Sequence, residues 1–183
     1  SPTTAPTSAS PKPSPPKATT SPAATRAAAA SQQSGARAGS ARAATGDDST
    51  NTVAAGANSQ VQQVVDLVNA ERAKAGCGKL ATDDKLMLAA QRHSQDQADH
   101  RTMSHTGSDG SNPGTRLDRV GYRWRTYGEN VAWNQQTPEA VMAAWMKSSG
   151  HRANILNCAF TEIGVGVANS NGPYWTQVFA APR

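Results

Sequence analysis

Three residues that can ionise or bind a metal stand beside glycine or small polar residues: His105, Glu129 and His151. Two neutral imidazoles and a carboxylate are a ligand set that can hold a zinc-like divalent ion and leave one position open for water. Without a metal, the same groups can act as general acids and bases, with Glu129 as the candidate base. Alternatively, each histidine bonds only its own loop. The three positions form a candidate site if they meet in one cleft.

Well-known catalytic signatures do not add to this set. The chain has no G-x-S-x-G elbow, no H-E-x-x-H pair and no phosphate-binding glycine loop. Gly164 and Gly166 lie within an expected strand, so they do not indicate a nucleotide site. They predict instead that a helix or a ligand approaches the strand backbone closely.

The residues that must position the site are confined to the second part of the chain. Residues 1–58 are rich in Ala, Ser, Thr and Pro, and all Trp, Tyr, Phe and Met residues lie beyond them. Such a segment cannot bury enough apolar surface to offset the entropy of ordering it, about 1–2 kcal/mol per residue for the backbone. We therefore expect a disordered tail or linker at 1–58 and one domain at 59–183, which we expect to be a monomer.

Charge and hydropathy exclude several classes of function. The net charge is +5, but residues 59–183 hold 13 Lys and Arg against 11 Asp and Glu. The basic excess therefore lies mainly in the tail, which can contact anionic surfaces, and the domain lacks the basic stripe of a specific nucleic-acid module. No apolar run is long enough to span a membrane. The tail composition is typical of secreted or envelope-associated proteins, and we expect that a signal peptide was removed before residue 1.

The pattern of apolar residues predicts an α+β fold. Helical spacing occurs in residues 59–74, in 84–101 after a cap at Asp83 or Asp84, and in 137–148 after Thr137 and Pro138, with a shorter helix at 116–120. Residues 104–114 read as a loop and 122–132 as an extended segment. Residues 162–168 and 174–180 read as a hairpin with Asn171 and Gly172 at positive φ in its turn. Helices should therefore cover a small antiparallel sheet.

Two further features have alternative interpretations. His93 falls on the inner face of the second helix, where a core histidine bonded to a backbone carbonyl is more common than a ligand. Cys77 and Cys158 either form a bridge in an exported protein or remain buried thiols in a cytosolic one. The expected export favours the bridge.

Four motifs occur in an order that resembles the CAP superfamily of cysteine-rich secretory, antigen 5 and pathogenesis-related proteins, in its bacterial extracellular form. They are residues 104–110, 128–130, 150–156 and 174–179, within a match over about 59–183. The resemblance implies a three-layer αβα sandwich, known in the family as an SCP domain, and a secreted protein. It also implies a cleft of two histidines and two glutamates that can bind a divalent metal.

Residue by residue, the resemblance covers half of that cleft. The first family histidine falls on His105 and the first glutamate on Glu129, but the second glutamate falls on Ser148 and the second histidine on Tyr174. The resemblance therefore implies a cleft of His105, Glu129, His151 and Tyr174 with weaker attraction for a metal. Pairing of Cys77 with Cys158 resembles the arrangement in actinobacterial members.

These observations lead to three functional hypotheses. The first is a secreted binding module that offers the cleft to a small amphiphile such as a lipid or sterol, to a cell-wall fragment, or to a partner protein. The second is a metal-assisted extracellular hydrolase with Glu129 as the general base. The third is a structural head on an envelope stalk.

Overall fold

The computed structural model describes residues 48–183, which fold into five helices and four strands. The helices are α1 (Asp48–Lys74), α2 (Asp84–Asp99), α3 (Pro113–Arg119), α4 (Pro138–Lys147) and α5 (Ser149–Ile155). The strands are β1 (Ala81–Thr82), β2 (Trp124–Trp133), β3 (Glu162–Ala168) and β4 (Tyr174–Pro182). Of the tail expected at 1–58, residues 1–47 lie outside the described part of the chain.

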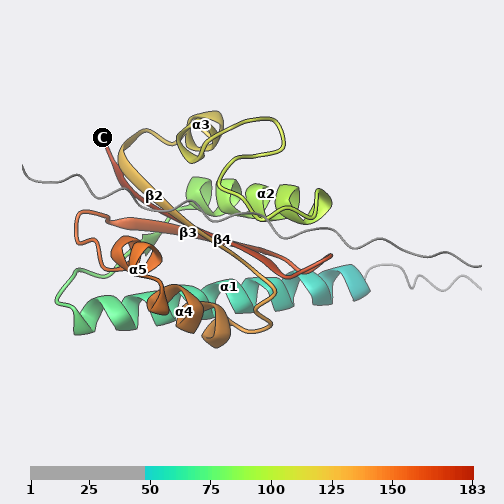
Figure 1. The fold of residues 1–183 in the computed structure, drawn as a ribbon, viewed down its shortest axis with the longest axis horizontal. Coiled ribbons are helices and arrows are strands. Elements are labelled where there is room, and N and C mark those ends of the chain that lie inside the picture. The colour runs from blue at the N-terminus through green and yellow to red at the C-terminus, as the bar shows by residue number, and fades with distance from the viewer. Residues whose placement is uncertain (1–47) are drawn as a thin grey trace, which may run out of the picture. The chain divides into compact units, whose positions relative to one another are not determined.

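The sheet lies between two helical layers, with α2 and α3 over one face and α1, α4 and α5 over the other (Figure 1). Its strand order is β1-β3-β4-β2. Strands β3 and β4 pair antiparallel, as expected for the hairpin. Strand β2, which was expected only as an extended segment, pairs antiparallel with β4, and β1 adds a parallel pairing with β3. The αβα sandwich is confirmed. The sheet is mixed rather than purely antiparallel, because β1 pairs parallel with β3. Strand β1 was not predicted, since a strand of two residues is too short to give a periodic pattern.

Alternation along β4 divides the core between the two faces of the sheet. Trp175 and Phe179 pack with Trp145 on the side of α1, α4 and α5, whereas Val178 packs with Leu86 on the side of α2. Each such side chain contributes about 1.5–3 kcal/mol when fully buried. Strand β2 forms one edge of the sheet and contacts α3 in one helical layer and α4 and α5 in the other.

The glycines of β3 allow α2 to pack directly on the strand backbone. A Cβ at Gly164 would lie 2.1 Å from the backbone carbon of Leu86, and a Cβ at Gly166 would lie 2.5 Å from that of Ala90. The close approach expected from the sequence is therefore made by a helix. It fixes the distance of α2 from the sheet.

Several helix boundaries follow the expected local signals. Asp83 caps α2 by accepting hydrogen bonds from the backbone N–H groups of Lys85 and Leu86. Thr137 caps α4, and Pro138 occupies its first turn. The predicted starts of α2 and α4 are thus confirmed. In each, the capping side chain satisfies backbone N–H groups that have no partner within the helix.

Three other boundaries differ from the sequence prediction. Helix α1 begins at Asp48, eleven residues before Ser59, in a stretch of mainly small and polar residues that has neither high helix propensity nor an apolar face to indicate a helix. Helix α3 begins at Pro113, within the expected loop 104–114, because proline suits a first helical turn after the Asn112 cap. After an extended Ser148, where the expected helix 137–148 ends, the chain starts a further helix, α5, that was not predicted.

The hairpin turn matches its prediction in part. Asn171 has a φ of 55°, as expected, but Gly172 does not adopt a positive φ and precedes a cis bond to Pro173. Glycine is required at 172 for space, because a Cβ there would lie 2.6 Å from the backbone nitrogen of Tyr174. The expected bridge between Cys77 and Cys158 is present and joins positions 81 residues apart.

Candidate functional site

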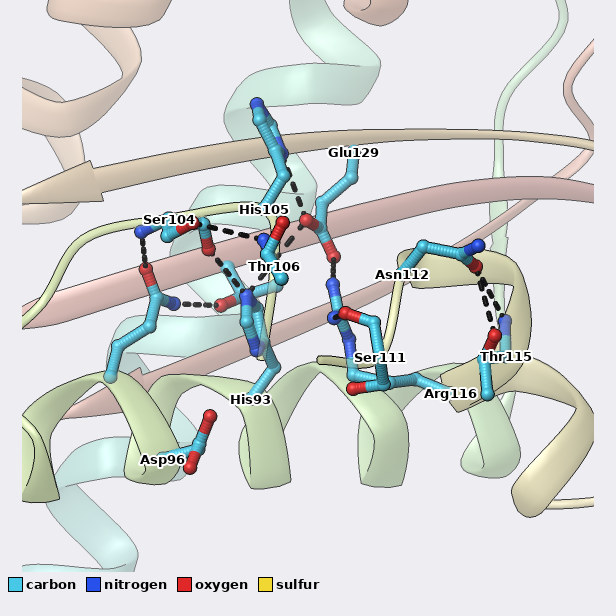
Figure 2. Close-up of polar contacts among 12 residues, drawn as sticks. His93, Asp96, Ser104, His105, Thr106, Ser111, Asn112, Thr115, Arg116 and Glu129 are labelled. Atoms are coloured by element: carbon cyan, nitrogen blue, oxygen red, sulfur yellow. Dashed lines mark hydrogen bonds and ion pairs between the residues drawn. The ribbon is translucent and has the colours of Figure 1, made fainter. Parts of the chain in front are cut away.

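The side chain of Glu129 is the centre of the candidate site. It projects from edge strand β2 toward the α2 layer and is only 2% exposed. Its Oε1 accepts a hydrogen bond from His105 Nδ1 at 2.9 Å, and its Oε2 accepts one from Arg116 Nη2 at 2.7 Å (Figure 2). Both carboxylate oxygens therefore have charged or polar partners.

Arg116 is a site residue that the sequence motifs do not indicate. It comes from α3, its side chain is 10% exposed, and its Nη1 also donates to the carbonyl of Ser111 at 3.0 Å. A buried carboxylate needs such a partner, because burying an isolated charge costs several kcal/mol. The useful signal was an acid within an expected extended segment, because a buried acid there needs a cation, although the sequence does not say which one.

His105 is the exposed member of the hydrogen-bonded group formed by His105, Glu129 and Arg116. Its side chain is 54% exposed, and Figure 2 shows its ring directed away from α2, with one nitrogen bonded to Glu129. The hydrogen bond to Glu129 raises the pKa of His105, although partial burial opposes the shift. The imidazole is thus held in one orientation by a group that is itself shielded from water.

The loop that carries His105 is fixed to α2 by polar contacts. The backbone N–H of Ser104 donates to Gln97 Oε1 at 3.1 Å, and the Ser104 carbonyl accepts a hydrogen bond from His93 Nε2 at 2.7 Å. Gln97 in turn donates to Thr176 of β4 at 3.0 Å. These contacts position the imidazole of His105 relative to the sheet.

His93 is a buried histidine bonded to a backbone carbonyl, as expected, but it is also a neighbour of the site. Its Nε2 lies 3.9 Å from Glu129 Oε1, and burial lowers the pKa of its imidazole. Its Nδ1 is buried and has no hydrogen-bond partner within the described residues. The neutral ring therefore presents an unused acceptor.

His151 borders the site from the other helical layer. It lies on α5 and is half-buried, and burial, followed by the positive charge of His105, lowers the pKa of His151. Its backbone carbonyl accepts a hydrogen bond from Asn130, which also donates to Gln177. The described contacts of this motif are thus made by its backbone and amides, and they tie α5 to the edge strand.

The predicted metal set does not form a coordination group in this structure. Within residues 48–183, no three or more His, Cys, Asp and Glu side chains are arranged to hold a metal ion. The Glu129 oxygens are occupied by His105 and Arg116 instead. The residues present therefore do not fit a zinc-type centre, and we assign no step to a metal.

Tyr174 lies away from the other predicted site residues. It pairs with Trp133 at one end of β2, whereas Glu129 pairs with Val178, four residues further along β4. Its side chain is buried against Ala98 and Ala168. The structure thus brings His105 and Glu129 together, places His151 at their border, and separates Tyr174 from them.

Comparison with known proteins identifies the family. The family model described as the cysteine-rich secretory protein family, CAP, matches residues 65–179, which is more than half of the chain. The chain belongs to the CAP family. The SCP-type sandwich that the sequence motifs implied is therefore supported by both the sequence match and the fold.

Similar proteins include two of Bacillus. The CAP chain is 41% identical over 132 residues to the uncharacterized protein YkwD of Bacillus subtilis, covering 72% of this chain and 51% of YkwD. A crystal structure of an extracellular protein containing an SCP domain, from Bacillus anthracis, matches with a TM-score of 0.69 and 32% identity. That match covers 74% of this chain and 45% of the other. The chain thus spans about half the length of these relatives.

A more distant structure shares the fold. An outer surface protein of Borrelia burgdorferi has a TM-score of 0.63 at 21% identity, covering 67% of this chain and 92% of its own.

Within residues 48–183 of the CAP chain, no helix combines the length and apolar character needed to cross a membrane.

Proposed function

We propose that this CAP domain is an extracellular binding module whose recognition centre is the exposed imidazole of His105 held on buried Glu129. The observation that supports the proposal is the difference in exposure between the two bonded side chains, 54% for His105 and 2% for Glu129. Burying an acid and Arg116 to orient one surface imidazole adds little to stability. Such an arrangement is typical of sites that act on a ligand.

The surroundings of His105 favour a hydrophilic ligand over a lipid or sterol. A hollow of about 500 Å³ is lined by Ser104 and Thr106, the two neighbours of His105, and by Asp96, Gln97, His100, Thr102, Gly107 and Ser108. None of these residues is hydrophobic. Among the ligand classes considered, a cell-wall fragment, with its hydroxyl, amide and carboxylate groups, is the best match. His105 can donate a hydrogen bond to an acidic group of such a ligand.

The test is an NMR titration of the domain with a soluble muropeptide. We expect saturable shifts near residues 104–108 and binding at least about tenfold weaker in His105→Ala, the usual effect of losing a charge-assisted hydrogen bond. Arg125→Ala is the control, because Arg125 is exposed and does not line this hollow. Unchanged affinity in His105→Ala would overturn the proposal, and a lower melting temperature with no other change would favour the structural head.

A second candidate function, a hydrolase that needs no metal, is favoured by the same pair of residues. A carboxylate bonded to Nδ1 of a histidine orients the other ring nitrogen as a proton acceptor in several hydrolases. The base would then be His105 rather than Glu129, whose oxygens are both engaged. Release of cleavage products during the muropeptide titration, abolished in His105→Ala, would support this function over simple binding.

A further inference from the structure

A second hollow lies beside the candidate site, between α2 on one side and α3 with the segment that leads into it on the other. Its volume is about 280 Å³, and its lining includes Ala89, Arg92, His93 and Arg116. Asp96 and Ser108 border both this hollow and the one next to His105. His105 does not line it, so an occupant here is a ligand beyond the one in the proposed function.

The imidazole of His93, which lines this hollow, has a buried acceptor without a partner. His93 is 1% exposed, and its Nε2 must carry the ring proton because it bonds the Ser104 carbonyl, which can only accept. Nδ1 of the neutral ring is therefore an acceptor, and it has no partner within the described residues. A buried polar atom without a partner costs about 1–3 kcal/mol, so a ligand O–H or N–H that reaches it gains that interaction.

The charges around the hollow leave one cation available. Arg116 is bonded to Glu129 and to the Ser111 carbonyl, Arg119 is paired with Asp109, and Asp96 accepts hydrogen bonds from Ser108. Arg92, by contrast, has no hydrogen bond or ion pair with any residue of the described part of the chain. It is exposed at the edge of the hollow, one residue from His93. An arginine fork in this position suits a carboxylate.

We infer that this hollow binds a small carboxylate that also carries an O–H or N–H donor. The carboxylate pairs with Arg92, and the donor bonds Nδ1 of His93. The volume lies just below the usual range of about 300–1,000 Å³ for ligand pockets, so the occupant is of the size of one sugar or one amino acid. Sugar acids and free amino acids share this chemistry.

The test compares three probes by NMR and calorimetry on the full chain. N-acetylmuramic acid and L-serine carry both groups, whereas N-acetylglucosamine has the sugar ring without the carboxylate. We expect one of the first two to bind saturably, with shifts at residues 89–96 and 116–120, and N-acetylglucosamine to bind at least about tenfold more weakly. The better of the two acids identifies the source of the ligand.

Variants assign the binding to this hollow. Arg92→Gln should weaken the acid about tenfold, Arg92→Lys should recover part of the loss, and Arg125→Gln, at an exposed arginine away from the hollow, should have no effect. Ala89→Leu should fill the hollow and abolish binding. His105→Ala should leave this binding intact, which separates it from the proposed function.

Three results would overturn the inference. These are no saturable shift with either acid, equal affinity for N-acetylglucosamine, and unchanged acid binding in Arg92→Gln. If Ala89→Leu does not fold, the comparison of Arg92→Gln with Arg125→Gln still decides, because both positions are exposed and their substitution leaves the core unchanged.

Discussion

At the scale of single residues, the protonation of His105 depends on one buried acid. The hydrogen bond and charge of Glu129 raise the pKa of His105. We expect Glu129→Gln to lower that pKa, because a neutral amide no longer favours the imidazolium. The measurement is an NMR pH titration of the His105 ring protons in both proteins. An identical His105 titration in Glu129→Gln would contradict the assigned pair.

The same shift has a consequence for stability. A histidine whose pKa is raised on folding stabilises the protein fully below its unfolded-state pKa, and the contribution is lost as pH rises through the raised pKa. The free energy of unfolding lost in His105→Gln should therefore be larger at about pH 5 than at about pH 8. Urea denaturation of the two proteins at both pH values measures this difference.

At the scale of elements, the packing of α2 on β3 rests on two positions without side chains. A Cβ at Gly164 would lie 2.1–2.5 Å from backbone atoms of Leu86 and Met87, which cannot move as a side chain can. We expect Gly164→Ala to lower the free energy of unfolding by more than about 3 kcal/mol, at the upper end of the usual cost of overpacking.

The matched control is Gly150→Ala in α5. A Cβ there meets no atom within 4 Å, and the residue has no positive φ, so alanine should raise stability by up to about 1 kcal/mol through helix propensity. Urea denaturation provides both values. Equal effects at the two glycines would mean that close packing is not what Gly164 contributes.

Local sequence signals were sufficient for most elements, but not for those set by tertiary contacts. The Asp83 and Thr137 caps and the two strand segments on either side of the turn at Asn171 were visible because each is a short-range pattern. Strand β1 was not, since its two residues are ordered by pairing with residues 162 and 163, far along the chain. Helix α5 was hidden because glycine and serine at its start resemble a stop signal.

At the scale of the whole molecule, the candidate site is assembled from a loop, an edge strand and a short helix. The motifs pointed to His105 and Glu129, but separations along the chain could not show that they bond. Arg116 was not predictable, because only the packed fold reveals which of 13 cations in residues 59–183 is buried beside the acid. The family resemblance placed Tyr174 in the cleft. Tyr174 lies four residues along β4 from Val178, the partner of Glu129, and four residues of a strand span about 13 Å, which is too far for Tyr174 to join the site.

Besides Arg116, a second buried arginine joins distant parts of the domain. Arg72, near the end of α1, is fully buried, and its guanidinium donates to the carbonyls of Ile155, Asn157 and Phe160, and to Gly78. The bridge between Cys77 and Cys158 links the same two regions. In the chain-entropy model a bridge over about 80 residues contributes up to about 4–5 kcal/mol.

The contacts of Arg72 imply that it contributes stability independently of that bridge. Arg72→Met should lower the free energy of unfolding by at least about 3 kcal/mol with the disulfide intact, because it leaves several buried carbonyls without donors. Arg72→Lys should recover only part of this loss, since a compact ammonium cannot reach carbonyls spread over two segments. Urea denaturation under oxidising conditions measures both, with exposed Arg125→Met as the control. If Arg72→Met is as stable as that control, the bridge alone holds α1 to the region after α5.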